Sequence, residues 1–319
     1  MIVCADCRTP SPADDLLSCP KCGWMPKRVG PLLEYISSKD RSSAEAAEYM
    51  EIYDALAERN LARQVTADEH VEGMSAECVR QLGGLAGKDV CDVGAGRGYF
   101  VKHALADGAR SVTAVDIAAP TLKVIAETYG IRSFLANAEN LPFEREFDVI
   151  VATDIVEHVL NVSNFLVTAN WSLRDGGRLL VRVPYLEDML DYSNFFGLPM
   201  HYTHLRTYDR KVIVHTLETA GFAVEKVYYD DFRVDYMHKA WAKFPGLKKR
   251  VYDYLSGRYG YGSIRDFHPL LRRLIMKPIE IGVIARKATH LERRNYHGDL
   301  ANFYLSRKQQ SDQSRQQAE

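Results

Sequence analysis

Short apolar runs alternate with segments of helical periodicity along the chain from residue 88 onward. The runs are rich in β-branched and aromatic residues, which is typical of strands, and the segments between them are typical of helices. This alternation predicts βαβ units and a Rossmann-like, doubly wound, mostly parallel sheet of the α/β class. The predicted strands are Asp89–Val93, Ser111–Asp116, Arg132–Ala136, Phe147–Ala152, Gly177–Val183, Phe222–Tyr229 and Ile279–Arg286, and the predicted helices between them are Tyr99–Asp107, Thr121–Tyr129, Asn164–Leu173 and Lys211–Ala220.

Three other stretches do not follow this alternation. Apolar residues recur at helical spacing in Ser42–Arg63, which predicts an amphipathic helix before the first of these strands. Residues 230–277 interrupt the alternation just before the last predicted strand. Residues 309–319 are polar and show no periodicity, so we expect this tail to be disordered.

The overall charge excludes little, but its distribution is uneven. Lys and Arg total 41 against 42 Asp and Glu, a net charge of −1, which does not favour a general nucleic-acid binder. Between Lys239 and Arg294, however, 14 basic residues face four acidic ones, so the rest of the chain carries −11. A local anionic partner therefore stays open. We find no apolar run of membrane-spanning length and no signal peptide, so the expected location is the cytoplasm.

Four of the six cysteines form two closely spaced pairs near the N-terminus. Cys4 and Cys7 are separated by two residues, as are Cys19 and Cys22. Two such turns complete a tetrahedral site of four thiolates, which favours a structural Zn²⁺ ion. Disulfides are less favoured in a reducing compartment. A redox-active pair is less favoured because two pairs occur and no strand precedes either one, and a metal-free turn stays open. Cys78 and Cys91 are expected to be buried as small apolar residues.

A glycine-rich loop joins the first predicted strand of the alternation to its helix. Gly94, Gly96 and Gly98 let the backbone turn tightly and approach a ligand. The third glycine lies one position before the place that the dinucleotide-binding pattern requires. Asp92 precedes the loop and suits a ligand ammonium or sulfonium. Asp116, at the end of the next strand, is placed to accept ribose hydroxyls.

Together with the segments Asn137–Phe143 and Phe147–Val159, this loop resembles the class I S-adenosylmethionine-dependent methyltransferases over residues 80–229. The resemblance implies their seven-strand sheet and S-adenosylmethionine as cofactor; a similar fold without a cofactor is the alternative. Asn137 departs from the Asp that many relatives carry. The N-terminal cysteine segment resembles zinc ribbons fused ahead of some bacterial methyltransferases. The cofactor-binding residues that the resemblance implies are Asp92, Gly94, Ala95, Gly96 and Gly98 for the methionine portion, Asp116 and Ile117 for the ribose, Ala138 and Glu139 for the adenine, and Thr153 at the pocket wall.

His158 is the candidate general base, because neutral imidazole is suited to proton removal near pH 7. Glu157 precedes it, and the alternative is that both residues only shape the pocket or cap a helix. Asp154, Glu157 and His158 also resemble the Glu-x-x-Glu-His metal triad of ubiquinone-biosynthesis O-methyltransferases, with Asp in place of the first Glu. Such a set would hold Mg²⁺ loosely, and this is the less favoured interpretation.

A segment rich in histidine follows the core strands. His201, His204, Arg206 and Tyr208 resemble a segment that precedes a late helix in these enzymes. The four residues are candidates for substrate contact. The alternative is that they cap the helix Lys211–Ala220.

The leading functional hypothesis is methyl transfer to an oxygen of a small metabolite or saccharide. The alternatives are an RNA methyltransferase that grips RNA with the ribbon and the basic segment, and a non-catalytic scaffold. The basic segment is also a candidate for peripheral contact with an anionic membrane surface or a lipid-linked substrate. The predicted organisation is a zinc ribbon at 1–36, a helical linker or cap at 37–87, the cofactor-binding core at 88–229, a basic helical insertion at 230–277, the last strand and a C-terminal helix at 278–306, and a disordered tail at 307–319.

Overall fold

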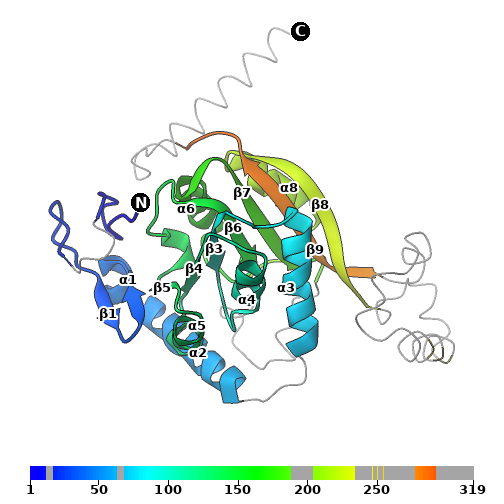
Figure 1. Ribbon diagram of the computed structural model, residues 1–319, viewed down its shortest axis with the longest axis horizontal. Helices are drawn as coiled ribbons and strands as arrows, with labels where there is room; N and C mark the ends of the chain where they lie inside the picture. The colour runs from blue at the N-terminus through cyan, green and yellow to red at the C-terminus, as the bar shows by residue number, and fades with distance from the viewer. Residues whose placement is uncertain are drawn as a thin grey trace, which may run out of the picture.

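The computed structural model describes residues 1–11, 17–62, 68–187, 204–233 and 277–291, together with the single residues 246, 250 and 254. Its centre is one nine-stranded sheet in the order β1-β2-β5-β4-β3-β6-β7-β9-β8 (Figure 1). The strands from β2 to β7 in this order pair in parallel, and β9 pairs antiparallel with both β7 and β8. The strands are β1 Lys27–Val29, β2 Leu32–Glu34, β3 Asp89–Val93, β4 Ser111–Asp116, β5 Arg132–Leu135, β6 Phe147–Thr153, β7 Leu173–Pro184, β8 Phe222–Arg233 and β9 Lys277–Lys287.

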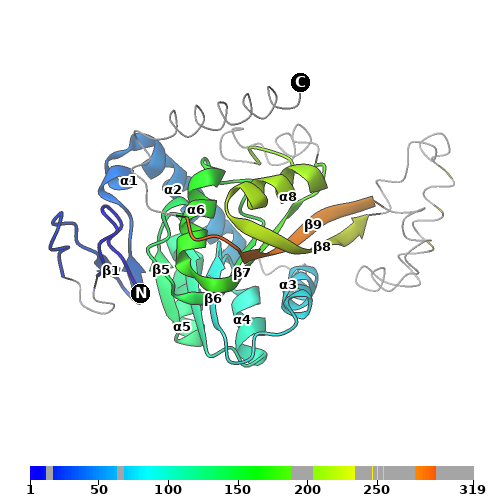
Figure 2. The same ribbon diagram turned by 90° about the horizontal axis from the view of Figure 1, so that it is seen from above.

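Helices cover both faces of this sheet, and two separate apolar clusters fill the space beneath them. One cluster joins α3, α4 and α5 to the sheet, and the other joins α6 and α8 to the opposite face (Figure 2). The doubly wound, mostly parallel fold predicted from the alternating pattern is therefore confirmed. The helices are α1 Ser38–Ser42, α2 Ala44–Ala62, α3 Asp68–Leu82, α4 Tyr99–Ala106, α5 Ala119–Tyr129, α6 Val162–Ser172 and α8 Arg210–Thr219, with a short 3-10 turn at Ala138–Asn140.

The N-terminal segment continues the central sheet. Strand β2 pairs in parallel with β5, which places Leu33 opposite Phe134. An aromatic row crosses this junction, with ring centroids 5.2 Å apart for Trp24 and Tyr35, and 5.3 Å apart for Tyr35 and Phe134. The side chains of these residues, Trp24, Leu33, Tyr35 and Phe134, are all buried in the same apolar cluster. The small segment thus shares a core with the main domain, because a unit of this size cannot bury enough apolar surface alone.

Several boundaries differ from the predicted ones. Leu173 begins β7 instead of ending the preceding helix, because its backbone pairs with Phe147 across the sheet. Strand β8 continues to Arg233, into the predicted insertion, because it stays paired with β9 as far as Lys277. Helix α3 lies in the predicted helical linker, where Ser42–Arg63 was the helix whose bounds were predicted. The rest of the insertion, the predicted C-terminal helix and the tail lie outside the described residues, apart from single positions.

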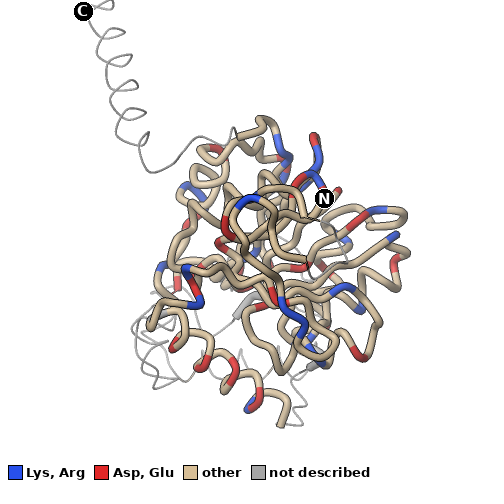
Figure 3. The backbone as a smooth tube through the Cα atoms, turned by 90° about the vertical axis from the view of Figure 1, so that its left-hand side faces the viewer, with Lys and Arg blue, Asp and Glu red and all other residues tan. Residues whose placement is uncertain are grey.

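Basic and acidic residues are interspersed along the described backbone (Figure 3). Most of the basic stretch between Lys239 and Arg294 lies outside the described residues. The predicted contact of this stretch with an anionic partner therefore stays a prediction. Among the helices that the structure describes, none combines the length and the apolar character that a membrane span requires.

Candidate functional site

A cavity of about 570 Å³ opens at the carboxyl ends of the parallel strands β3, β4, β5 and β6. Ligands of open α/β sheets bind at this edge, because the loops that follow the strands converge there. Helix α2 closes the outer wall. Of the predicted cofactor residues, Gly94, Gly96, Asp116, Ile117, Ala138 and Glu139 line the cavity, whereas Asp92, Ala95, Gly98 and Thr153 do not.

The glycine loop forms the floor of this cavity. The backbone N–H groups of Gly94 and Ala95 both donate to the carbonyl of Val115, at 2.8 and 3.2 Å, which fixes the loop against β4. Gly94 has a φ of +73°, and a Cβ added there would lie 2.7 Å from Cδ1 of Ile155. Only glycine fits this position, because both the backbone conformation and the space exclude a side chain.

Two carboxyl groups, the buried Asp92 and the half-buried Asp116, lie next to the loop. Asp116 accepts hydrogen bonds from the N–H groups of Gly96 and Ala118, each at 2.8 Å. Burial, together with the nearby Asp116, raises the pKa of Asp92 to about 8. Burial also raises the pKa of Asp116. A cationic ligand offsets such desolvation, so this pair suits a ligand that carries positive charge.

The loops after β5 and β6 are joined at the far end of the cavity. The Asn137 side chain accepts from the N–H of Glu139 at 2.9 Å and caps the 3-10 turn. The Glu139 carboxylate in turn accepts from the N–H groups of Leu160 and Asn161, at 2.8 and 3.1 Å. Ala138 and Glu139, the predicted adenine neighbours, are therefore held in place by contacts from both loops.

Helix α2 contributes residues that the sequence did not single out as ligand contacts. Tyr49 and Tyr53 lie one helical turn apart and both line the cavity. Burial raises the pKa of Tyr49 to about 12, and burial followed by the neighbouring Tyr49 raises the pKa of Tyr53 further. Both phenols are thus neutral at physiological pH. The available signal was a pair of hydroxyl-bearing residues within an otherwise apolar helical stripe.

His158 meets this helix across the cavity. Its Nδ1 atom lies 3.1 Å from the hydroxyl oxygen of Tyr53. On its other side, the ring centroid lies 4.5 Å from that of His204 in an edge-to-face arrangement. His204 is itself held by a contact between its Nδ1 and the carboxylate of Glu187. The imidazole of His158 is therefore oriented by two neighbours at the cavity wall.

Glu157 is buried beside these histidines. Its side chain is 1% exposed, and its two carboxylate oxygens accept no hydrogen bond from the described residues. Nε2 of His204 lies 3.9 Å from its Oε1. Burial, and after it the charge of Asp154, raises the pKa of Glu157 well above its usual range. Burial therefore favours the neutral form of this carboxyl group.

Asp154 lies apart from the other two members of the predicted magnesium triad. Its Oδ2 accepts from Nη1 of Arg182 at 2.8 Å, and Arg182 is 3% exposed. The residues whose ligand atoms do approach within 4.8 Å of one another are Glu157, His158 and His204. This set offers one carboxylate and two imidazoles, whereas Mg²⁺ prefers oxygen ligands. The structure does not assemble the oxygen-rich triad.

Of the remaining predicted substrate residues, Arg206 supports the loop around His158. Arg206 donates to the backbone carbonyls of Val156, Val159 and Leu160. Tyr208 is buried, with a pKa raised to about 12 by burial, and its backbone pairs with Tyr185. His201 lies outside the described residues. A direct substrate contact by any of the four stays a prediction.

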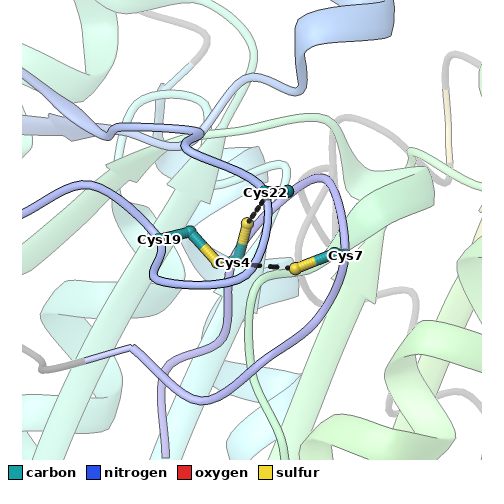
Figure 4. Close-up of side chains that lie close together, drawn as sticks. All are labelled: Cys4, Cys7, Cys19 and Cys22. Carbon is teal, nitrogen blue, oxygen red and sulfur yellow. Dashed lines mark hydrogen bonds between the residues drawn. The ribbon is translucent and has the colours of Figure 1, made fainter.

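The N-terminal cysteines converge on one point (Figure 4). The sulfur atoms of Cys4 and Cys22 lie 3.6 Å apart, those of Cys7 and Cys19 lie 3.5 Å apart, and all four lie within 4.8 Å of one another. Four sulfurs at the usual Zn–S distance lie about 3.8 Å apart in a tetrahedron. These separations fit a zinc ion and are far too long for disulfide bonds.

A family model described as a methyltransferase domain matches residues 46–227, more than half of the 319 residues. The chain therefore belongs to the methyltransferase domain family, as its resemblance to the class I enzymes predicts. The match begins at α2, so this helix and its cavity-lining tyrosines are part of the family's domain.

Curated relatives share part of this domain. A Mycolicibacterium smegmatis protein named "Probable S-adenosylmethionine-dependent methyltransferase" is 32% identical over 144 residues, which cover 44% of this chain and 54% of the relative. The demethylmenaquinone methyltransferase of Tropheryma whipplei is 36% identical over 107 residues, 32% of this chain and 44% of the relative. The tRNA U34 carboxymethyltransferase of Methylococcus capsulatus is 32% identical over 113 residues, 32% of this chain and 34% of the relative. The chain thus spans about half, or less, of these relatives.

Solved structures share the fold. The Burkholderia thailandensis 1,6-didemethyltoxoflavin-N1-methyltransferase, solved with 1,6-didemethyltoxoflavin and S-adenosylhomocysteine, matches with a TM-score of 0.51 at 18% identity, covering 78% of this chain and 92% of the neighbour. A chain in the complex of the Haloferax volcanii Trm112 methyltransferase activator with a methyltransferase matches with a TM-score of 0.53 at 16% identity, covering 74% and 98%. At these identities the likeness shows the fold alone.

Proposed function

We propose that this protein transfers a methyl group from S-adenosylmethionine to a hydroxyl oxygen of a small-molecule or saccharide acceptor. The observation that carries the proposal is the single cavity that the glycine loop borders on one side and His158, oriented by Tyr53, borders on the other. One side suits a cationic cofactor, and the other suits a group that gives up a proton. Membership of the methyltransferase domain family supports the cofactor assignment.

The residues around the cavity fit this cofactor chemically. Asp116, half-buried at the end of β4, would hold the ribose hydroxyls, and the Gly94–Gly98 loop would leave room for the methionine portion above Asp92. Because the pKa of Asp92 is raised to about 8, a bound cation would favour its ionised form. Ala138 and Glu139 would flank the adenine.

The proposed chemistry is a single displacement. S-adenosylmethionine, when bound, supplies a methyl group that its sulfonium already activates. The protein aligns the acceptor oxygen with that methyl group, and positioning of this kind supplies much of the rate. His158 would take the proton of the acceptor hydroxyl as its oxygen receives the methyl group from the sulfonium. This needs the tautomer in which Nδ1–H donates to Tyr53 and Nε2 carries the lone pair.

Glu157 and His204 define the acceptor side of the proposed site. A neutral Glu157 carboxyl can donate a hydrogen bond as well as accept one, so it suits a hydroxyl group of the acceptor. His204, fixed by Glu187, limits the rotation of the His158 ring. Polar groups of this kind favour a neutral, hydroxyl-bearing molecule over a strongly charged one.

We also propose that Cys4, Cys7, Cys19 and Cys22 hold a structural zinc ion. Their sulfur separations and tetrahedral donor set support this. Zinc bound by four thiolates has no open position for chemistry, so its contribution is to the folded state.

RNA is the second candidate acceptor. The similarity to the tRNA U34 carboxymethyltransferase of Methylococcus capsulatus favours it. Such an enzyme would lose affinity for its acceptor steeply as salt rises, because several Lys and Arg residues would contact phosphates.

The two acceptors can be separated directly. The purified protein would be incubated with methyl-labelled S-adenosylmethionine and either a small-molecule extract or total RNA, each prepared from cells that lack the protein. We expect label in the extract and none in the RNA, and the His158→Ala variant should abolish most of it. Label in RNA alone would favour the second candidate.

A further inference from the structure

The first cysteine turn, residues 4–8, is called the zinc turn here. It lies directly against residues 138–143, the adenine segment, which closes the adenine end of the cavity. Arg8 follows the ligand Cys7 and donates three hydrogen bonds into this segment. Its Nη1 donates to Oδ1 of Asn140 at 3.1 Å and to the carbonyl of Leu141 at 3.0 Å, and its Nη2 donates to the carbonyl of Phe143 at 3.0 Å. One side chain therefore fixes three successive points of the chain after β5.

The contact is reciprocal. The side-chain amide of Asn140 donates to the carbonyl of Ala5 at 2.8 Å, and Ala5 lies between the proposed ligands Cys4 and Cys7. The N–H of Val3 donates to the carbonyl of Pro142 at 2.9 Å. The backbone between two metal ligands is thus hydrogen-bonded to the same segment that Arg8 holds.

Arg8 is itself fixed in place. Its φ is +57°, a left-handed conformation that a residue without glycine's freedom adopts only when its surroundings hold it. Its guanidinium lies 4.8 Å from the ring centroid of Trp171, on α6. A planar guanidinium with several fixed donors suits this position, whereas a lysine ammonium cannot reach the same acceptors in one geometry.

The other end of the segment reaches the cavity. Asn140 is the last residue of the 3-10 turn, whose first two residues, Ala138 and Glu139, line the cavity. A continuous chain of contacts therefore runs from the cysteine turn through Arg8 and Asn140 to the proposed adenine neighbours.

We propose that Arg8 is a positioning residue for the cofactor, and that zinc binding at the N-terminal cysteines sets cofactor affinity by holding the adenine segment in its binding conformation. This inference rests on the proposed function. Without the zinc turn, the segment would have to be ordered when the cofactor binds, and the cost would appear as weaker binding. Arg8 does not line the cavity, so it would act on the cofactor through Asn140.

The test compares Arg8→Lys with Arg41→Lys. Both arginines belong to the N-terminal region and lie over a tryptophan ring, but Arg8 donates to the adenine segment, whereas Arg41 pairs with Glu34 on β2. For each protein the zinc content, the melting temperature, and the dissociation constants of S-adenosylhomocysteine and adenosine would be measured. Adenosine is included because it lacks the amino-acid portion, so it reports on the ribose and adenine end.

We expect Arg8→Lys to retain its zinc and to bind both ligands about tenfold more weakly, while Arg41→Lys stays within twofold of the wild type. Asn140→Ala should reproduce the loss, and the double variant should lose less than the sum of the two, because both residues act through one contact. Removing zinc from the wild-type protein with a chelator should weaken both ligands at least as much.

Dissociation constants within twofold of the wild type in zinc-loaded Arg8→Lys and Asn140→Ala would overturn the inference. An equal loss in Arg41→Lys would overturn it too, because the effect would then be a general loss of stability. A wild-type protein that binds neither ligand would contradict the proposed function itself. A wild-type protein that binds both ligands, with variants that bind them equally well, would contradict only the positioning role of Arg8.

Discussion

Tyr53 and His158 meet at 3.1 Å, hydroxyl oxygen to Nδ1, although 105 residues separate them along the chain. The contact joins α2, outside the alternating strands and helices, to the loop after β6. It orients the imidazole toward the cavity and makes the helix part of the candidate active site.

The first prediction concerns this pair. His158→Ala should lower turnover by roughly 100-fold or more, because the proton of the acceptor would lose its base. Tyr53→Phe should lower turnover roughly threefold to tenfold, since it removes one hydrogen bond that selects the tautomer. Steady-state kinetics would measure both, and calorimetry should find cofactor affinity nearly unchanged. His215→Ala, at an exposed position on α8, is the control; full activity in His158→Ala would return that residue to a structural role.

A second prediction follows from the buried carboxyl of Asp92. Its pKa is about 8 in the folded chain and about 3.8 ordinarily, so the folded state binds the proton more tightly than the unfolded state. This group therefore stabilises the fold fully below about pH 4 and loses that contribution as the pH rises toward 8. Asp92→Asn removes the dependence, so its melting temperature relative to wild type should increase from pH 5 to pH 8.

Thermal melts across this pH range would test the effect of Asp92. Glu225→Gln, which alters a partly exposed ion pair with Arg286, serves as the control and should give no such trend. A constant difference between Asp92→Asn and the wild type at every pH would mean that burial does not raise the pKa of this group. The same variant should bind the cofactor more weakly, because it cannot become an anion.

The third prediction concerns the cysteine cluster. The purified protein should carry about one zinc per chain, and Cys22→Ser should lose it and melt at a lower temperature. Cys22 is the exposed member of the four, so the loss would not come from a disturbed core. Cys91→Ala, at a buried cysteine away from the cluster, should keep its zinc. A metal-free protein that folds and melts like the zinc-loaded one would refute the assignment.

The fourth prediction separates backbone strain from steric exclusion in the glycine loop. Gly94 and Gly130 both have positive φ values, +73° and +63°, so alanine strains the backbone at either position by about 1 kcal/mol. Only at Gly94 does the added Cβ collide, with Ile155; at Gly130 nothing lies within 4 Å. Gly94→Ala should therefore weaken S-adenosylhomocysteine binding at least tenfold, whereas Gly130→Ala should lower stability alone. Equal affinities in the two variants would contradict this account of the loop.

The central strands could be predicted from the sequence because their pattern is local. Asp89–Val93 and Ser111–Asp116 coincide with β3 and β4, since each is a short apolar run bounded by polar loops. The cavity position follows from the same pattern, because parallel strands bring their carboxyl ends to one edge. This is why Gly94, Gly96 and Asp116 could be named as cavity residues before any coordinates.

The contacts that complete the site depend on distant pairings that no local pattern encodes. The strand β2 pairs with β5 across about 100 residues, and it is too short to give a periodic signal. In the sequence, Arg8 cannot be distinguished from other charged residues, because its acceptors at Asn140, Leu141 and Phe143 are distant along the chain. Helix α3 did carry a signal, since Met74, Cys78 and Leu82 recur every fourth position and are all buried.

Asp154 illustrates the same limit at a single position. Its spacing from Glu157 and His158 suggested a shared metal site. Asp154 has a positive φ of +54°, and its carboxylate pairs with the buried Arg182. The residue whose ligand atom lies near those of Glu157 and His158 is His204. His204 lies 46 positions beyond His158, so it could not be inferred from that motif.

The most direct test of the account is a calorimetric titration of the wild-type protein and of Asp116→Asn with S-adenosylhomocysteine. We expect one binding site per chain in the wild type and an affinity at least tenfold weaker in Asp116→Asn, because an amide replaces the carboxylate that accepts the ribose hydroxyls. A melting curve of each protein would establish that both are folded. A folded wild-type protein that shows no binding, or an Asp116→Asn variant that binds as tightly as the wild type, would contradict the placement of the cofactor in this cavity.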